Sequence, residues 1–187
     1  MQWNDHSNLE GLHALLSPSQ YYWVKYNQEK LMDMKVTKDA AERGTRYHNL
    51  AKELIELNVP LPKNHKTFNM YVNDAIGFKM RPEQPLYYSR YCFGTADTIS
   101  FKEKKSFLRI HDLKTGIKVP AKLTQLEVYA ALFCLEYDIR PADIEIELRI
   151  YQFDDILCGH PTAEDIVPIM DQIITADKLY SEMDEGE

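Results

Sequence analysis

The spacing of apolar residues in the first third of the chain predicts helices. Three segments have this spacing: 16–27, 39–58 and, more weakly, 67–79. The first begins with Ser17, a residue type that caps helix N-termini, followed by Pro18, which suits the first helical position. The second helix has one apolar face, made of Tyr47, Leu50, Ala51 and Leu54, and the sequence NVPLP ends it.

The pattern changes after residue 80. Segments rich in aromatic and β-branched residues predict a meander of three strands: 85–91, 93–101 and 106–114. A helix at 123–138 follows, and then a strand at 143–153, whose isoleucine and leucine side chains alternate with polar ones. The last helix, at 162–180, contains Pro168, where we expect an interruption.

This order of elements predicts a single domain of the α/β (α+β) class over residues 1–187. We divide it into a helical part (1–80), a core of sheet and crossover helix (81–153), and a C-terminal helix with an acidic tail (154–187). The core would be a mixed central sheet flanked by helices, with the first helices as an N-terminal extension.

Composition excludes several classes of protein. No apolar run approaches the ~20 residues of a membrane helix, and the first residues do not resemble a signal peptide, so a cytoplasmic protein is expected. Three widely spaced cysteines without a C-x-x-C pair argue against a disulfide framework or an iron–sulfur cluster. Cys158 and His160 lack the second pair that a zinc site would need.

The net charge of −7 speaks at first against nucleic acid as a partner. Between Phe101 and Gln125, however, seven basic residues face only two acidic ones, Glu103 and Asp112, so the acidity belongs to the C-terminal third. A solvated surface rich in lysine would give the same pattern. Charge alone therefore leaves DNA binding open.

Asp97, Asp112 and Lys114 are the first candidates for chemistry. Asp112 and Lys114 are two residues apart on a predicted strand, so their side chains leave the same face. Asp97 lies on the neighbouring strand, at a distance that brings it level with Asp112. Two converging carboxylates repel each other unless a cation lies between them, and such oxygen ligands suit Mg²⁺ or Mn²⁺. A surface hairpin with scattered charges would also contain a D-x-K sequence.

Four motifs in order strengthen the first interpretation. They are His48 inside a helix, Gly94-Thr95-Ala96-Asp97, Asp112-Leu113-Lys114, and Gln125 with Tyr129 one helical turn later. In this order and at these spacings, over residues 17 to 153, the sequence resembles the PD-(D/E)XK nuclease superfamily, in its RecB-type exonuclease branch. The stretches GTRYHNLAKELI and DLKTG are similar to small phage and bacterial members.

The resemblance implies a metal site and a catalytic role for each motif. Asp97 and Asp112 would bind one or two Mg²⁺ or Mn²⁺ ions, with His48 as imidazole ligand and the Leu113 carbonyl as a further oxygen. Lys114 would position or activate the hydrolytic water. Gln125 and Tyr129 would orient that lysine or contact the DNA.

Four candidate residues have a structural alternative. His48 would also fit as a residue on the flank of the helix, and Tyr129 as a packing residue beneath the sheet. Lys118 and Lys122 would flank the site and contact DNA phosphates, although solvated lysines are the competing interpretation.

The sequence departs from the family pattern in two places. The cysteines that hold an iron–sulfur cluster in some relatives are missing, so no such cluster is expected. The acidic residue that some members carry before the G-x-x-D motif has no clear counterpart. Glu83 is the nearest candidate and lies in a stretch that reads as a loop.

The function expected from the resemblance is that of a metal-dependent DNA exonuclease acting on linear or single-stranded DNA in replication, recombination or repair, in a phage-infected cell. A partner protein or a homo-oligomer would help so small a domain to hold DNA. Two alternatives remain: an endonuclease or flap nuclease on the same fold, and an inactive module that binds nucleic acid or protein. Fold alone does not separate these.

Overall fold

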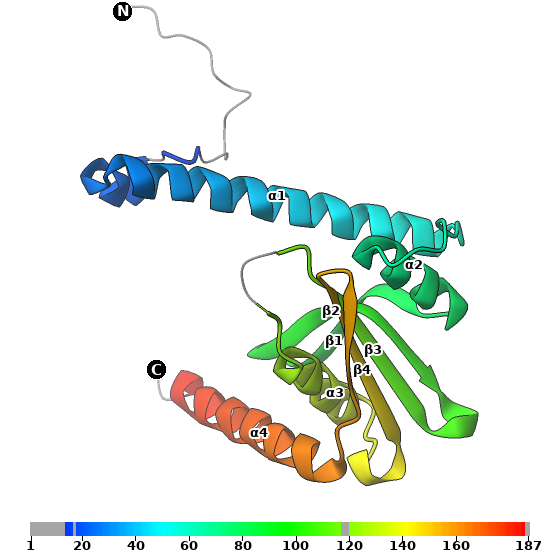
Figure 1. The fold of residues 1–187 in the computed structure, drawn as a ribbon. Helices are drawn as coiled ribbons and strands as arrows, with labels where there is room; N and C mark the ends of the chain where they lie inside the picture. The colour runs from blue at the N-terminus through cyan, green and yellow to red at the C-terminus, as the bar shows by residue number, and fades with distance from the viewer. Residues whose placement is uncertain (1–13, 17, 117–119, 186–187) are drawn as a thin grey trace, which may run out of the picture. The chain divides into compact units, whose positions relative to one another are not determined.

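The computed structural model describes residues 14–16, 18–116 and 120–185. The chain divides into two compact units, Met1–Thr45 and Arg46–Glu187. The first unit contains the 3-10 helix η2 (Pro18–Lys25) and the beginning of helix α1 (Gln28–Glu56), which continues into the second unit (Figure 1). Segment 16–27 is thus a 3-10 turn rather than an α-helix, and Ser17 lies outside the described residues. Helix α1 begins well before residue 39.

The second unit is built on one five-stranded sheet. Its strands, in chain order and in order across the sheet, are β1 (Arg81–Ser89), β2 (Cys92–Lys102), β3 (Phe107–Leu113), β4 (Glu145–Gln152) and β5 (Asp155–Gly159). All neighbours pair antiparallel except β3 and β4, which are parallel. A parallel pair needs a crossover, and helix α3 (Thr124–Glu136) supplies it. The predicted α+β class and the three-stranded meander are confirmed.

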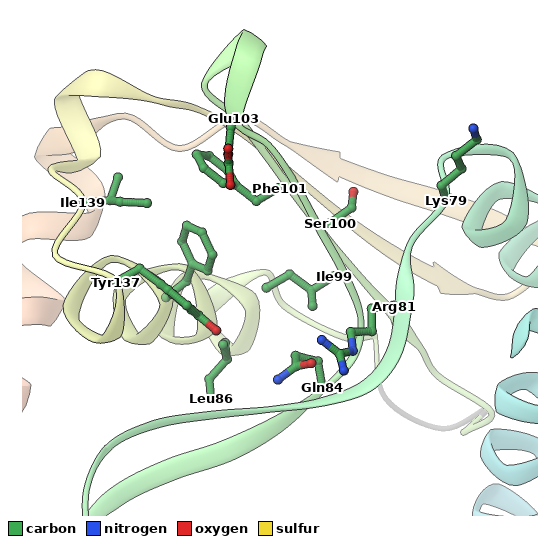
Figure 2. Close-up of a pocket in the computed structure, with 11 residues that line it drawn as sticks. Lys79, Arg81, Gln84, Leu86, Ile99, Ser100, Phe101, Glu103, Tyr137 and Ile139 are labelled. Atoms are coloured by element: carbon green, nitrogen blue, oxygen red, sulfur yellow. The ribbon is translucent and has the colours of Figure 1, made fainter.

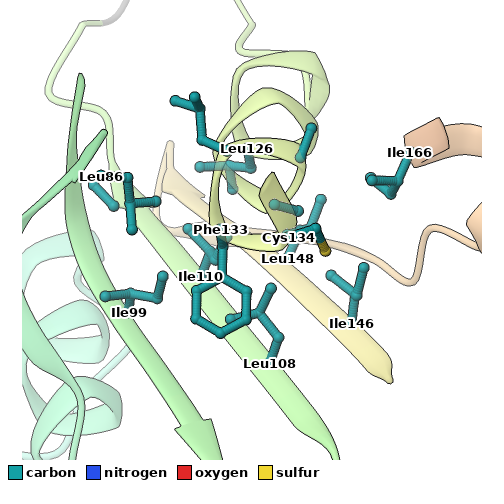
Figure 3. Close-up of a cluster of buried hydrophobic side chains, with 14 of the residues drawn as sticks. Leu86, Ile99, Leu108, Ile110, Leu126, Phe133, Cys134, Ile146, Leu148 and Ile166 are labelled. Carbon is teal, nitrogen blue, oxygen red and sulfur yellow. The ribbon is translucent and has the colours of Figure 1, made fainter. Parts of the chain in front are cut away.

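Helices cover both faces of this sheet (Figure 1). Helix α3 and helix α4 (Ala163–Glu185) pack over one face, where apolar side chains of the sheet and of α3 interlock (Figure 3). Helix α2 (Thr67–Gly77) and the last turns of α1 cover the other face, around Tyr71, Val72 and Tyr151. Among the described residues, no helix combines the length and the apolar character that crossing a membrane requires.

Two local predictions are wrong and one strand was missed, each for a physical reason. On α1 the buried residues are Ala51 and Ile55, whereas Tyr47 and Leu50 are exposed, because the helix meets the sheet through a face rotated toward His48. Helix α4 continues through Pro168, its sixth residue, where the missing N–H removes one intrahelical hydrogen bond without ending the helix. Strand β5 was not predicted, because it is a short edge strand with little buried surface.

Strand β1 also begins earlier than predicted, at Arg81 rather than Pro85. Pro82 and Pro85 made this stretch resemble a loop. Because β1 is an edge strand, a residue without an N–H group is tolerated there. Glu83 therefore lies within a strand, which changes its relation to Asp97.

Candidate functional site

The site forms where strands β2 and β3 separate. Their backbone pairing ends with Thr98 opposite His111, so Asp97 and Asp112 are the next residues along the two strands. The backbone N–H of Leu113 donates to Oδ2 of Asp97 at 2.9 Å. If the pairing of the two strands continued, a backbone carbonyl of β2 would accept the hydrogen bond from this N–H group. Here the Asp97 carboxylate accepts it instead. This fixes Asp97 beside the end of β3.

Strands β1 and β2 are irregular at the same level. Ala96 and Ile99 both belong to the core beneath α3, although residues three apart on a regular strand point to opposite faces. Opposite this irregularity, Glu83 has a φ of 48°, which is uncommon for a residue with a Cβ atom. The pairs on either side, Pro82 with Thr98 and Gln84 with Ala96, place Glu83 across from Asp97. The distortion brings the two carboxylates together.

His48 reaches this point from helix α1. Its Nδ1 atom is 3.4 Å from Oδ2 of Asp97 and 3.9 Å from Oε1 of Glu83. One potential ligand atom from each of the three residues lies within 4.8 Å of the others. The Asp97 carboxylate beside it raises the pKa of His48, and burial together with the Asp97 charge raises the pKa of Glu83. These three side chains have the composition of a divalent-metal site.

Asp112 and Lys114 lie next to this group. Asp112 is only 2% exposed, and its Oδ1 accepts a hydrogen bond from Nζ of Lys114 at 3.0 Å. The other oxygen, Oδ2, is buried and has no hydrogen-bond partner. Burial, and then the charge of Asp97, raise the pKa of Asp112 to about 6. The five side chains form the carboxylate cluster: His48, Glu83, Asp97, Asp112 and Lys114.

Helix α3 contributes Gln125 and Tyr129, as the sequence predicts. The Oε1 atom of Gln125 accepts a second hydrogen bond from Nζ of Lys114, also at 3.0 Å. The lysine is therefore held between a carboxylate and an amide. Tyr129 lies over Gly94, where an added Cβ atom would come within 3.1 Å of its ring. Gly94 thus gives Tyr129 the space it occupies beside the site.

The remaining predicted residues fall into three cases. The side chain of Leu113 is buried in the core beneath α2, so only its backbone is suited to a role as ligand. Lys122 is exposed just before α3 and forms no ion pair with a described residue. Lys118 lies outside the described residues. The structure therefore brings seven functional candidates together, Glu83 included, whereas Lys122 has no ion-pair partner among the described residues.

Glu83 is the residue that sequence patterns placed least well. Its signal was present, since it lies in the right part of the chain for the acidic residue of some relatives. The flanking prolines hid the strand that carries it. Glu83 lies close to His48 and Asp97. It is therefore a candidate for the acidic residue that had no clear counterpart in the sequence.

A second polar cluster, the buried network, lies on the opposite face of β3 and β4: Asp74, Arg109, His111, Glu147, Arg149 and Tyr151. Arg109 and Arg149 both pair with Glu147, and Arg149 also donates to Asp74. Both guanidinium groups lie over the ring of Phe78. Two arginines balance two acids within this network, which is typical of a structural cluster, although Nε of Arg149 and Nε2 of His111 have no hydrogen-bond partner among the described residues.

A cavity of about 590 Å³ lies between β1, β2 and the C-terminal end of α3 (Figure 2). Arg81, Gln84 and Tyr137 line it, over a floor of apolar side chains. None of the carboxylate cluster lines this cavity, so it does not share the chemistry of the site.

The residues of the carboxylate cluster fit a divalent cation. The buried Oδ2 of Asp112 lacks a partner, and His48, Glu83 and Asp97 present potential ligand atoms within 4.8 Å of one another. Carboxylate oxygens suit Mg²⁺, and a set that adds an imidazole also suits Mn²⁺. No model of a known protein family matches the sequence, and no curated protein matches it.

Proposed function

We propose that this protein is a metal-dependent DNA nuclease of the PD-(D/E)XK superfamily, in its RecB-type branch, and that it acts as an exonuclease on linear or single-stranded DNA. The observation that carries the proposal is the junction of β2 and β3. Asp97 and the buried Asp112 converge there, with Lys114 fixed between Asp112 and Gln125. That arrangement matches what the resemblance implies at each of these positions.

The bound ion would be Mg²⁺ or Mn²⁺, held by His48, Asp97, Asp112 and Glu83, with the Leu113 carbonyl as a further oxygen. When bound, it would supply positive charge for the attacking and leaving oxygens of the phosphodiester. Lys114 would donate a hydrogen bond to the attacking water, and Gln125 would keep its ammonium group in place. Tyr129 would lie beside the bound DNA strand.

The chemistry is hydrolysis. The oxygen of water forms a bond to phosphorus, the P–O ester bond breaks, and the leaving oxygen takes up a proton and departs as an alcohol. The ammonium group of Lys114 would oppose the negative charge that develops on the phosphoryl oxygens. Lys114 acts from a fixed position, since its hydrogen bonds to Asp112 and Gln125 already hold its ammonium group in place.

The setting that we propose is the cytoplasm, including that of a phage-infected cell, during replication, recombination or repair. A partner protein or a second copy of the chain would extend the grip on DNA, because the sheet unit alone offers a small surface. No membrane is involved in this proposal.

The test is incubation of the purified protein with end-labelled linear DNA in Mg²⁺, in Mn²⁺ and in EDTA. We expect cleavage in one or both metals and none in EDTA. Asp112→Ala should remove the cleavage, because a central ligand is lost. Cleavage that persists in EDTA, or in Asp112→Ala, would show that another site is responsible.

Circular single-stranded DNA separates the two nuclease alternatives. An exonuclease leaves it intact, whereas an endonuclease cuts it. A protein that binds DNA and cleaves neither substrate would be the inactive binding module, and the proposal would fall.

A further inference from the structure

A second cavity, of about 550 Å³, opens directly beside Lys114. Its walls come from four places: Tyr47 on α1, Lys66 to Phe68 at the start of α2, the segment Leu113 to Gly116 after β3, and Phe153 and Asp154 in the turn between β4 and β5. Its size lies in the usual range for small-ligand sites. Because Lys114 belongs both to this cavity and to the carboxylate cluster, a ligand here would lie next to a phosphate at the site.

Three aromatic side chains line this cavity and keep open surface. Tyr47 is 46% exposed, Phe153 is 51% exposed, and Phe68 is partly buried. Tyr47 and Phe68 meet edge to face, with ring centroids 5.4 Å apart. Exposed rings are the surfaces on which unpaired bases stack, at about 1–3 kcal/mol per base.

Phe153 occupies an unusual position. Both residues of the turn between β4 and β5 have positive φ angles, 57° at Phe153 and 56° at Asp154. Such turns favour Asn and Gly, and a bulky residue there is strained. Asp154 has a structural reason, since its carboxylate accepts hydrogen bonds from the N–H and hydroxyl of Thr67. No comparable interaction is seen for the side chain of Phe153. Its ring makes no contact with another aromatic ring in the described part of the chain and stays half exposed.

The charges in the cavity do not oppose a nucleic-acid strand. Asp154 is the acid in its lining, and Lys66 pairs with it at 2.9 Å. Lys114, which also pairs with Asp112, adds a positive charge to the lining. The cavity therefore joins aromatic walls to a cation, as sites for single-stranded nucleic acid do.

We propose that this cavity is a subsite for one unpaired nucleobase of the DNA strand, stacked among Tyr47, Phe68 and Phe153, next to the phosphate that Lys114 faces. The inference rests on the proposed function, because it takes Lys114 to face a phosphate. A base inside a duplex is paired and stacked, and extruding it costs a few kcal/mol. The subsite would thus select single-stranded ends over blunt duplex.

The decisive variant is Phe153→Asn. Asn tolerates positive φ, so this change should preserve or raise thermal stability while it removes the ring. Binding is measured in EDTA, where no cleavage is expected, by fluorescence anisotropy with a dye-labelled thymidine oligonucleotide. We expect Phe153→Asn and Tyr47→Ala each to weaken single-strand binding by about fivefold or more. Binding of a blunt duplex of the same length should change little.

Tyr180→Ala is the matched control. Tyr180 is also a tyrosine on a helix, 49% exposed, in edge-to-face contact with Tyr91 at 5.5 Å. Tyr180→Ala removes a side chain of the same type as Tyr47, but Tyr180 does not line the cavity. Binding of single-stranded DNA should therefore be unchanged. Phe153→Trp, which keeps a stacking surface, should bind at least as well as the natural protein.

The outcomes separate the two proposals. If the natural protein cleaves DNA with metal, but Phe153→Asn and Tyr47→Ala bind single strands as it does, the subsite is wrong and the nuclease assignment stands. If the two variants weaken duplex and single-strand binding equally, selection of an unpaired base is wrong. If the natural protein cleaves no DNA in either metal, the proposed function falls and the subsite falls with it.

Discussion

The two faces of the sheet carry acidic side chains in opposite electrostatic settings. In the buried network, the side chains of His111, Arg109 and Arg149 hold the pKa of Glu147 well below its usual range. In the carboxylate cluster, burial and a neighbouring acid raise the pKa of Asp112 to about 6. The neighbours of Glu147 stabilise its charged form, whereas the surroundings of Asp112 disfavour its charged form. The difference separates an acid whose charge its neighbours stabilise from an acid whose charge is disfavoured, and the second kind is the one that the proposed cation site requires.

The largest expected effect separates activity from stability. Lys114→Ala should lower cleavage by about 10²–10⁴-fold, the range for losing a group that assists proton transfer or charge in the transition state. Arg149→Ala should instead unfold much of the protein, because Glu147 and Asp74 would lose their shared partner. Steady-state cleavage and thermal unfolding measure the two effects.

Lys178→Ala is the control for the lysine change. Lys178 is exposed on α4 and also has a carboxylate partner, Glu182. It should retain normal cleavage. If Lys114→Ala were as active as this control, the carboxylate cluster would not be the catalytic site.

The next effect is a pair of changes with opposite signs. Glu147→Gln should lower the free energy of unfolding by about 3 kcal/mol, because the buried Arg109 loses its counter-charge and Arg149 loses one of its two acidic partners. Asp112→Asn, measured in EDTA above pH 7, should raise it by up to about 3 kcal/mol, since a carboxylate in an unfavourable setting becomes neutral. Urea unfolding of both variants provides the measurement. The same sign for both would remove the contrast between the two faces.

The pH dependence follows from the same shift. Between about pH 4 and 6, folded Asp112 keeps a proton that the unfolded chain has lost, so this group lowers the stability of the metal-free protein as pH rises. Glu147 acts in the other direction, and its contribution is lost as pH falls below the value of an ordinary glutamate. Asp112→Asn should remove the first slope and leave the second.

A smaller effect concerns metal affinity. His48→Ala should weaken Mn²⁺ binding by about tenfold or more, because an imidazole next to Asp97 and Glu83 is removed. Isothermal titration without DNA is the measurement, and the exposed His160→Ala serves as control. An unchanged titration would assign His48 to a purely structural position on the flank of α1.

The smallest effect is at Gly94. In Gly94→Ala the new Cβ atom would approach the Tyr129 ring to 3.1 Å, so the ring must shift by a few tenths of an ångström. We expect a loss of about 1 kcal/mol in stability and a severalfold decrease in the turnover rate. Gly77→Ala, where an added Cβ meets nothing within 4 Å, is the control for activity. Equal activity in both variants would show that Tyr129 tolerates the displacement.

Local patterns in the sequence were sufficient for most of the fold and for the pairing of the site motifs. Aromatic and β-branched residues located β2 and β3, alternation of apolar residues located β4, and the spacing of Asp112 and Lys114 placed both side chains on one face. The i, i+4 spacing put Gln125 and Tyr129 on one side of α3. These features depend on neighbours in the chain, which a sequence displays directly.

The rest depends on contacts between distant residues. Glu83 joins the site because β1 is distorted opposite Asp97, and no local pattern announces a distortion that a neighbouring strand accommodates. The rotated face of α1 is set by what Ala51 and Ile55 meet in the sheet unit. The buried network was missed for the same reason, since Asp74 and Arg149 are remote in sequence.

The turn at Asp154 has a consequence for how the protein folds. Helix α2 begins after Lys66, which provides no side-chain cap, and the N–H of its first residue, Thr67, donates to a carboxylate 87 residues further along the chain. Closing so long a loop is slow compared with forming a local turn. The start of α2 should therefore become ordered late in folding, after the β4–β5 hairpin. Amide hydrogen exchange at Thr67 would then report on the completed sheet rather than on the helix alone.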